Sequence, residues 1–383
     1  MNMPLNFLRR AAGVFLCAAV LSANTARSAT ALVHDTGTEI LTSGDFNGDG
    51  IADILVLDKL TGNARVGYLD SNGVIAWSAP LVSGVENVSG AAVGPFLIAG
   101  TDALGVTAPG LNLVNLVSLA NSNNAATPVA ITPSGIGPHG LVTLLNPLRV
   151  PSPAAPALLV ASSDNSASTE QMEWRQIAGG AATPGGSFPE TGPFDRGNAL
   201  SLGPPDSPTL AAGLVRGADA DRFDVLQFTN GPGGILLSWT NLPAGGDYAF
   251  GIFNGESLPR IAFYQPGASN LTIVPLLSGD GGLQFGTNLT VPLAEAVQRV
   301  FYLPPAATGT FLVQFADGVQ AIQLSGDTAV AGAVYRSGLA DPNNAFTGLV
   351  PLDSGQFVLL DAAAGAGAST HAQVVSFDGT TFS

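Results

Sequence analysis

The most informative part of the chain reads Gly44-Asp45-Phe46-Asn47-Gly48-Asp49-Gly50-Ile51-Ala52-Asp53 and continues directly into the apolar run Ile54–Leu57. Oxygen-bearing side chains alternate with other residues, and the glycines permit the sharp bend that lets those oxygens converge. A hard cation such as Ca²⁺ takes six to eight oxygens at roughly 2.3–2.6 Å. We therefore expect Ca²⁺ here, with these candidate ligands: Asp45, Asn47, Asp49, Ile51 and Asp53.

The residues after this loop indicate which secondary structure flanks it. The first ligand positions match the start of an EF-hand loop, but the twelfth position is Val56, so the bidentate glutamate of an EF-hand is absent. The short apolar run 54–57 is typical of a buried strand. The sequence therefore predicts a cation loop between two strands rather than between two helices.

The segment Gly44–Gly50 resembles, without a gap, the loop of the FG-GAP/VCBS repeat, and the resemblance extends over Thr42–Trp77. In that family the motif Asp-x-Asp/Asn-x-Asp-Gly-x-x-Asp joins the first and second strands of a propeller blade and holds Ca²⁺. The resemblance implies an integrin-α-like β-propeller, with relatives that include integrin heads and some Ca²⁺-dependent lectins. By this fold-level analogy, we expect binding or adhesion rather than catalysis.

Composition favours many short strands and turns. The chain has 383 residues, of which 48 are glycine and 27 are proline, and only 11% are charged. Its hydrophobic fraction of 46% argues against disorder, which requires low hydrophobicity and high charge. This length fits one large repeat domain or two ordinary domains.

Residues 1–28 have the pattern of a secretory signal peptide. Arg9 and Arg10 precede the apolar core Ala11–Ser22, and small residues within 26–31 offer a cleavage site. This core is too short for a membrane span, which takes about 20 residues. We expect a signal peptide over 1–28, a single propeller domain over 29–383, and a secreted, periplasmic or cell-surface location. The single cysteine, Cys17, lies inside the signal, so the mature chain would have no disulfide.

The charge balance excludes some classes of partner. The chain has 28 acidic and 13 basic residues, and the signal holds none of the acidic residues but three of the basic ones, which leaves a mature net charge of −18. Such a surface repels nucleic acid and anionic lipid headgroups. We therefore expect no nucleic-acid partner. We also expect no membrane span, and a monomer that binds an extracellular protein or glycan.

Seven segments repeat the pattern of a short apolar strand entered from a polar or turn residue. They are Asp53–Leu57, Asp102–Val106, Pro156–Val160, Asp224–Phe228, Arg260–Tyr264, Thr310–Gln314 and Gln356–Leu360. Their starts are 49, 54, 68, 36, 50 and 46 residues apart, and a period near 50 with short strands is typical of a β-propeller. The sequence predicts an all-β, seven-bladed propeller of four-stranded blades, while six or eight blades also fit.

Two details of the ring follow from the spacing. The uneven steps of 68 and 36 indicate an insertion within Thr183–Pro208, before the fourth blade. The seventh unit offers three strands, within 347–352, 357–361 and 372–377, and lacks its outer one. Since an open ring would expose strand edges, we expect Ala31–His34 to pair with the last blade and close it.

The fifth unit aligns with the first without a gap, Gly251–Ile261 on Gly44–Ile54. Arg260 replaces the last acidic ligand, so we expect its guanidinium to take the cation's place and neutralise Glu256. The fourth unit gives a weaker second candidate metal site, in which Arg216 and Arg222 flank the acids. Its ligands would be Asp219, Asp221 and Asp224.

Other residues give little support for catalysis. The histidines, His34, His139 and His371, are widely separated and match no metal or triad spacing, so we expect no catalytic residue. The tryptophans, Trp77, Trp174 and Trp239, could serve as sugar platforms, but their apolar strands favour packing between blades.

The function predicted from the sequence is a secreted, Ca²⁺-binding, non-catalytic module for a protein or glycan ligand. The alternative is an extracellular carbohydrate-active enzyme, such as a polysaccharide lyase, on a propeller scaffold. It stays open because any of 28 acidic residues could supply a carboxylate pair. A structural module of the cell envelope is a third interpretation.

Overall fold

The computed structural model describes residues 34–383 with short gaps. The gaps are 36, 112, 121–125, 131–137, 145–155, 164–168, 179–180, 192–193, 202–208, 218–220, 230, 254–255, 281, 305–308, 338–347, 353–354 and 361–371. The predicted signal peptide over 1–28, its cleavage site and His371 lie outside the described residues.

The described residues form seven antiparallel sheets and no helix. The first sheet has the order β1-β2-β3-β4-β5, with β6 also beside β4: β1 (His34–Asp35), β2 (Glu39–Gly44), β3 (Asp53–Asp58), β4 (Asn63–Leu69), β5 (Ile75–Trp77) and β6 (Leu81–Val82). The second consists of β7 (Gly90–Ile98), β8 (Thr101–Thr107), β9 (Leu113–Ser118) and β10 (Ala126–Ala130). The third consists of β11 (Pro138–Leu144), β12 (Ala157–Ser163), β13 (Thr169–Ala178) and β14 (Ala181–Thr191).

The remaining four sheets continue in chain order. The fourth consists of β15 (Phe194–Ser201), β16 (Thr209–Val215), β17 (Asp221–Thr229) and β18 (Gly231–Leu242). The fifth consists of β19 (Asp247–Gly251), β20 (Arg260–Tyr264), β21 (Asn270–Gly279) and β22 (Gly282–Phe285), with β23 (Leu289–Pro292) also beside β21. The sixth consists of β24 (Arg299–Leu303), β25 (Thr310–Gln314), β26 (Gly318–Ser325) and β27 (Thr328–Arg336), and the seventh of β28 (Gly348–Pro351), β29 (Gln356–Leu360) and β30 (Ala372–Ser376).

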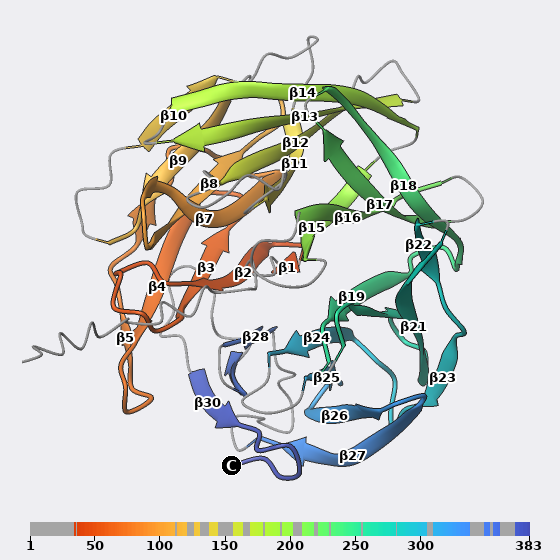
Figure 1. The fold of residues 1–383 in the computed structure, drawn as a ribbon. Helices are drawn as coiled ribbons and strands as arrows, with labels where there is room; N and C mark the ends of the chain where they lie inside the picture. The colour runs from red at the N-terminus through yellow and green to blue at the C-terminus, as the bar shows by residue number, and fades with distance from the viewer. Residues whose placement is uncertain are drawn as a thin grey trace, which may run out of the picture.

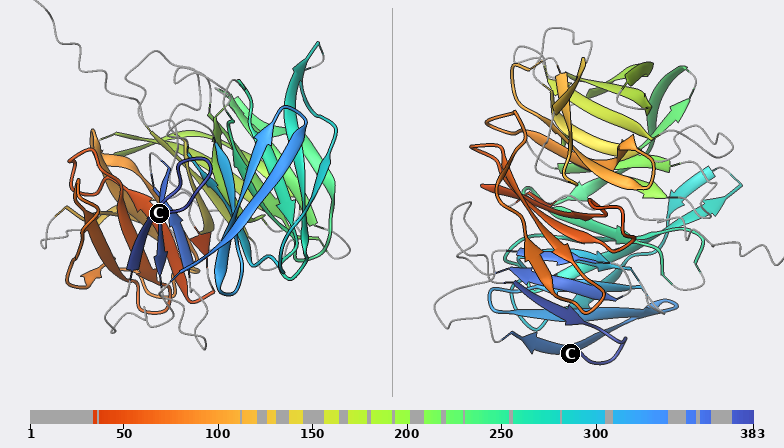
Figure 2. Two further views of the ribbon diagram at one scale, coloured as in Figure 1. Left: turned by 90° about the horizontal axis from the view of Figure 1, so that it is seen from below. Right: turned by 90° about the vertical axis from the view of Figure 1, so that its left-hand side faces the viewer.

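The seven sheets stand around a common axis, so the predicted seven-bladed β-propeller is confirmed (Figure 1). First strands such as β15 and β19 lie near the axis, whereas last strands such as β18 and β27 lie at the rim (Figure 1). Figure 2 shows the last sheet, in blue, beside the first, in orange and red.

The second strand of each sheet is mostly apolar because neighbouring sheets cover both of its faces. Strand β20 (RIAFY) and strand β25 (TFLVQ) are buried at all five positions. A strand buried on both faces has no polar side to alternate with, which explains the continuous apolar runs seen in the sequence. By contrast, most side chains of β27, at the rim, are exposed.

The hydrophobic core is divided into seven clusters, one between each pair of neighbouring sheets. The cluster that closes the ring joins Leu41 and Ile54 of the first sheet to Val350 and Val358 of the last. No sheet could bury both faces alone, so each depends on its neighbours for its core. The ring is therefore closed by face-to-face packing.

The predicted closing strand does not pair as expected. Within the described part of 31–34, His34 pairs with Leu41 of β2 in the first sheet, not with the last sheet. The last sheet instead uses the chain end, because Phe382 bridges to Phe377 and the Ser376 and Ser383 backbones exchange two hydrogen bonds of 2.9 Å. A local hairpin at the chain end replaces the long-range pairing.

The fourth unit was also placed wrongly. Six of the seven predicted segments lie in second strands, but Asp224–Phe228 lies in β17, the third strand of its sheet. The true second strand is β16, and second strands then start 48, 56, 52, 51, 50 and 46 residues apart. The expected insertion in Thr183–Pro208 is wrong for its described part, because these residues form most of β14 and all of β15. The uneven spacing came from the missed strand.

Candidate functional site

The predicted cation loop joins β2 to β3, as expected for the first and second strands of a blade. The Asp45 carboxylate organises it by accepting three backbone N–H groups, from Gly48 at 2.7 Å, Asp49 at 3.1 Å and Gly50 at 2.9 Å. Gly48 and Gly50 have φ of 78° and 89°, which side chains other than glycine rarely adopt. The bend predicted from the glycines is therefore present.

The middle of the loop is exposed and holds itself by short-range hydrogen bonds. The Asn47 amide oxygen accepts the Asp49 N–H at 2.9 Å, and its nitrogen donates to the Asp49 carboxylate at 2.8 Å. The other Asp49 oxygen accepts the Ile51 N–H at 2.7 Å. These contacts hold the amide and carboxylate oxygens of Asn47 and Asp49 on the solvent side of the turn.

Asp53 is the most buried of the predicted ligands, with no exposed surface. Its carboxylate accepts the Phe46 N–H at 3.0 Å and the Leu69 N–H at 3.1 Å, so it links the loop to β4. Burial raises the pKa of Asp53 to about 6; the two N–H donors oppose this rise, and the charges of Asp49 and Asp45 add to it. The loop therefore concentrates negative charge around a buried carboxyl.

The neighbouring sheet fixes the loop from outside. The Asp45 N–H donates to the Asp102 carboxylate at 2.9 Å, and the Asp102 N–H donates to the Asp45 carbonyl at 2.8 Å. Phe46 is fully buried in the cluster between the first and second sheets. In the sequence, Asp102 stands out only as the start of a predicted strand. Its acidic side chain at that position was the one available sign of this contact.

The donor set suits a hard cation in chemistry, since it consists of three carboxylates, one amide and a backbone carbonyl at Ile51. Among the described residues, however, no three histidine, cysteine, aspartate or glutamate side chains lie close enough together to hold a metal ion. Oxygens of Asp45 and Asp53 are turned toward backbone N–H groups. Ca²⁺ in this loop therefore stays a prediction.

The weaker second candidate site is arranged differently. Asp219 lies outside the described residues, and the segment joins β16 to β17, so it is not the counterpart of the first loop. Asp221 accepts from Arg216 at 2.5 Å, and Asp224 accepts from Arg222 at 2.6 Å. Each described carboxylate is thus already paired with a guanidinium.

In the fifth sheet, Arg260 and Glu256 form the ion pair predicted from the alignment. The Arg260 Nε lies 2.8 Å and 3.1 Å from the two Glu256 oxygens, and one terminal nitrogen lies 2.5 Å from Glu256 Oε1. The Arg260 side chain is 9% exposed and that of Glu256 is 29% exposed. The guanidinium neutralises the carboxylate from within the chain.

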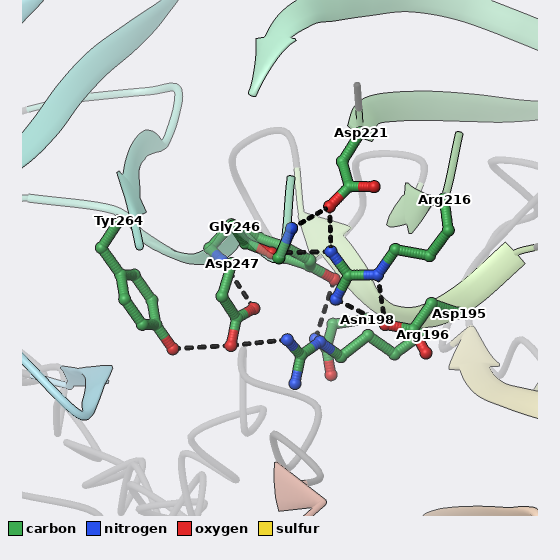
Figure 3. A network of polar contacts seen from close by, with 10 residues as sticks. Asp195, Arg196, Asn198, Arg216, Asp221, Gly246, Asp247 and Tyr264 are labelled. Atoms are coloured by element: carbon green, nitrogen blue, oxygen red, sulfur yellow. Dashed lines mark hydrogen bonds and ion pairs between the residues drawn. The ribbon is translucent and has the colours of Figure 1, made fainter. Parts of the chain in front are cut away.

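A second polar centre lies between the fourth and fifth sheets (Figure 3). Arg216 bridges Asp195, at 2.7 Å, and Asp221, at 2.5 Å, and donates to the Gly246 carbonyl at 2.8 Å. The Gly245 N–H also donates to Asp221, at 2.8 Å. One arginine therefore ties the fourth sheet to the connection that leads into the fifth.

The same centre contains a half-buried ion pair across the two sheets. Arg196 of β15 lies 2.6 Å from Asp247 of β19, and the Tyr264 hydroxyl donates to the same Asp247 oxygen at 2.7 Å (Figure 3). Burial alone would lower the pKa of Arg196, but Asp247 raises it above its ordinary value. Burial also raises the pKa of Tyr264, so its hydroxyl keeps the proton that it donates.

The two centres lie on opposite faces of the ring. We call the face that carries the β2–β3 loop the Asp45 face. The other is the Thr38 face, where β2, β15 and β19 begin, and it carries the Arg196–Asp247 centre. It also has a cavity of about 440 Å³, lined by Gly37, Thr38, Asp58, Lys59, Leu60, Asn87 and Val88.

The remaining candidates are histidines and tryptophans. His34 lies in β1 and His139 in β11, in different sheets. Trp174 is buried, and Trp239 stacks on Phe263 of the next sheet at 5.4 Å, which fits packing between blades. No helix among the described residues is long and apolar enough to cross a membrane.

Comparison with known proteins shows the fold and no family. No family model matches the sequence, and no curated protein does, so membership of the FG-GAP/VCBS family stays a prediction. The chain is similar to the solved structure of BBS1N in complex with ARL6DN, soaked with lead, with a TM-score of 0.58 and 11% identity over 92% of this chain and 94% of that one. The mercury-soaked form of that complex gives 0.54 and 10% over 90% and 96%.

Proposed function

We propose that this chain is a non-catalytic binding module that acts outside the cytoplasm, holds Ca²⁺ in its β2–β3 loop and binds a protein or a glycan. The observation that carries the proposal is the loop itself. Burial raises the pKa of the Asp53 carboxyl to about 6, and the charges of Asp49 and Asp45 add to this rise. A cation would offset this charge, and the available oxygens are of the kind that Ca²⁺ prefers.

The proposed binding role is supported by the fold. A propeller of similar size, BBS1N, was solved in complex with a protein partner, ARL6DN, and the likeness extends over most of both chains. Propellers present the loops of every blade on one broad surface, which suits recognition of a large ligand. Since identity is 11%, the partner of BBS1N says nothing about which ligand this chain binds.

The Thr38 face is the proposed ligand face. Its cavity combines a lysine, an aspartate and an asparagine with two apolar side chains, and one of these, Leu60, is 71% exposed. Asn87, in the cavity wall, has φ of 54° and is the one residue other than glycine with positive φ among the described residues. Such backbone conformations are often found at binding sites.

Thermal unfolding with and without Ca²⁺ tests the metal. At a Ca²⁺ concentration of about 100 times its Kd, the parent should gain about 2.7 kcal/mol of stability relative to chelator. Asp49→Ala should lose that gain, and the exposed turn variant Asp327→Ala should keep it. Equal melting of parent and Asp49→Ala in both conditions would show that the loop holds no Ca²⁺.

A glycan array tests the ligand class. The parent, Leu60→Asp and Asp49→Ala should be applied with Ca²⁺ and with chelator, and bound glycans should be checked for cleavage. Binding without product that Leu60→Asp abolishes would support a lectin-like module on the Thr38 face. New reducing ends or unsaturated products would instead support the enzyme alternative. No binding to any glycan would leave a protein as the ligand.

A further inference from the structure

The rim of a propeller consists of strand edges, and most described sheets protect theirs. The third, fourth and sixth sheets shift register where β14, β18 and β27 pair with their neighbours. The rim strands β5, β6, β22 and β23 have four residues or fewer. Strand β10 carries Pro128, which has no N–H to donate. Bulges, short strands and prolines all hinder further strand pairing.

Strand β30 of the seventh sheet has none of these features. It consists of Ala372–Ser376 (AQVVS), without charge or proline, and it pairs with β29 in unbroken register. Among the described residues, the other six sheets each have at least four strands, whereas this one has three. The chain end covers only one end of β30, where Ser376 and Ser383 exchange hydrogen bonds.

The backbone direction identifies which groups remain on this edge. In an antiparallel ladder, alternate residues direct their N–H and C=O to the same side. Because Ser376 directs both groups to Ser383, Val374 and Ala372 direct theirs to the same outer edge. In the part of the chain that the structure describes, β30 has no strand partner there besides the chain end.

We propose that the outer edge of β30 binds an extended strand of a partner protein, which takes the fourth position of the seventh sheet. All described strand pairs are antiparallel, so the guest strand would run antiparallel to β30, in line with Thr381–Ser383. It would bond the backbone of Val374 and Ala372. This inference names a partner class for the proposed binding module and rests on that function.

The surroundings of β30 define the chemistry of the guest strand. Ala372 and Val374 are half-buried and pack against the cluster that joins the last sheet to the first, as Ile75 and Trp77 also do. Alternate guest side chains would cover these residues, so β-branched, uncharged side chains fit best. The edge recognises an extended backbone first and its apolar side chains second.

A second copy of this chain fits the edge less well. Antiparallel pairing of β30 with itself would end after two residues, because the outward groups of Ser376 are already bonded to Ser383. Two chains of net charge −15 also repel each other. A strand from another protein could begin beside Ser383. It would then avoid both the bonded groups of Ser376 and the repulsion between two copies of this chain.

Amide hydrogen exchange in the full chain tests the proposal with a capped Thr-Val-Thr-Val-Thr-Val peptide. With the free peptide at about ten times its Kd, exchange at Val374 and Ala372 should slow about tenfold. The matched control has the same sequence with N-methyl groups on alternate residues, so it cannot complete the ladder. Unchanged exchange at both residues, or equal slowing by the control, would overturn the proposal.

A tail variant gives an independent reading. Thr-Val-Thr-Val-Thr appended after Ser383 should fill the edge within the chain, raise the Tm and remove the effect of the added peptide. A Gly-Ser-Gly-Ser-Gly tail should do none of these. Peptide protection that survives the filled edge would contradict the proposal. Slowing that depends on protein concentration alone would identify a second copy as the occupant and would also overturn it. Thermal unfolding with and without Ca²⁺ reports on the β2–β3 loop and not on β30. A failure of the proposed function can therefore be distinguished from a failure of this proposal.

Discussion

The loops that join the first and second strands of sheets one and five share one frame, Gly44–Ile54 and Gly251–Ile261, but differ in charge. In the first loop, Asp45 and Asp53 accept backbone N–H groups, and negative charge accumulates. In the fifth, Arg260 neutralises Glu256 within the chain. The same sequence frame is thus compatible with a charge that needs an outside partner and with one that is balanced internally.

What the two loops share is their attachment to the next sheet. The Asp45 N–H donates to Asp102, and at the equivalent position of the fifth loop the Tyr302 hydroxyl donates to the Ile252 carbonyl. A Cβ on Gly251 would overlap the Tyr302 ring, so a glycine is required before the loop there. Contact with the neighbouring blade, rather than a metal, is the common structural role.

The largest expected effect comes from removing the internal cation of the fifth loop. Arg260→Met keeps the volume of a buried side chain but leaves Glu256 unpaired, and breaking a buried ion pair costs about 3–5 kcal/mol. Because Glu256 is 29% exposed, we expect a loss of about 2–3 kcal/mol in the free energy of unfolding, measured in urea.

The double variant Glu256→Gln with Arg260→Met is the control for that experiment. It leaves no unpaired charge, so it should recover most of the lost stability. A double variant as unstable as Arg260→Met would mean that packing of the arginine stem, and not its charge, fixes the fifth loop.

The second largest effect is a dependence of stability on pH that comes from the first loop. The pKa of Asp53 is about 6 in the folded chain against an ordinary 3.8, so ionised Asp53 opposes folding. In chelator, its contribution to stability should therefore improve as pH falls from about 7 through 6 toward 4. The full shift corresponds to about 3 kcal/mol, and the backbone donors and local relaxation reduce the expected gain to about 2 kcal/mol.

Melting curves of the parent and Asp53→Asn between pH 7 and pH 4.5 would measure this effect. The variant should be less stable at the outset, since an amide nitrogen meets a backbone N–H, but it should lack the gain at low pH. Saturating Ca²⁺ should remove the gain from the parent by keeping Asp53 ionised. Parallel pH profiles of parent and variant would contradict the raised pKa.

The ring could be predicted from sequence because second strands are buried on both faces and stand out as continuous apolar runs. The exception, β16 (TLAAGLV), is rich in small residues because the Phe194 ring packs where a Cβ of Gly213 would lie. It therefore resembles a loop more than a core strand. The adjacent β17 contains the expected acidic entry at Asp224 and was chosen instead.

Contacts between blades could not be predicted in the same way. The Arg196–Asp247 pair and the Asp45–Asp102 contact join residues about 50 positions apart on separate sheets. Their partners are set by the order and tilt of the blades, which local patterns do not encode. The Arg260–Glu256 pair was predictable because both residues lie within one loop and align with the predicted ligand positions of the first loop.

The smallest effect tests the feature that the two loops share. Tyr302→Phe removes the hydroxyl that donates to Ile252 while the ring stays packed against Phe253 and Phe311, so we expect a loss of about 1 kcal/mol in urea unfolding. Asp102→Asn should cost a similar amount in the first loop, because its amide oxygen can still accept the Asp45 N–H but without the charge. Neither change should alter the pH profile of the other loop. If Tyr302→Phe is neutral while Asp102→Asn is severe, attachment to the next blade matters only where the loop carries unbalanced charge.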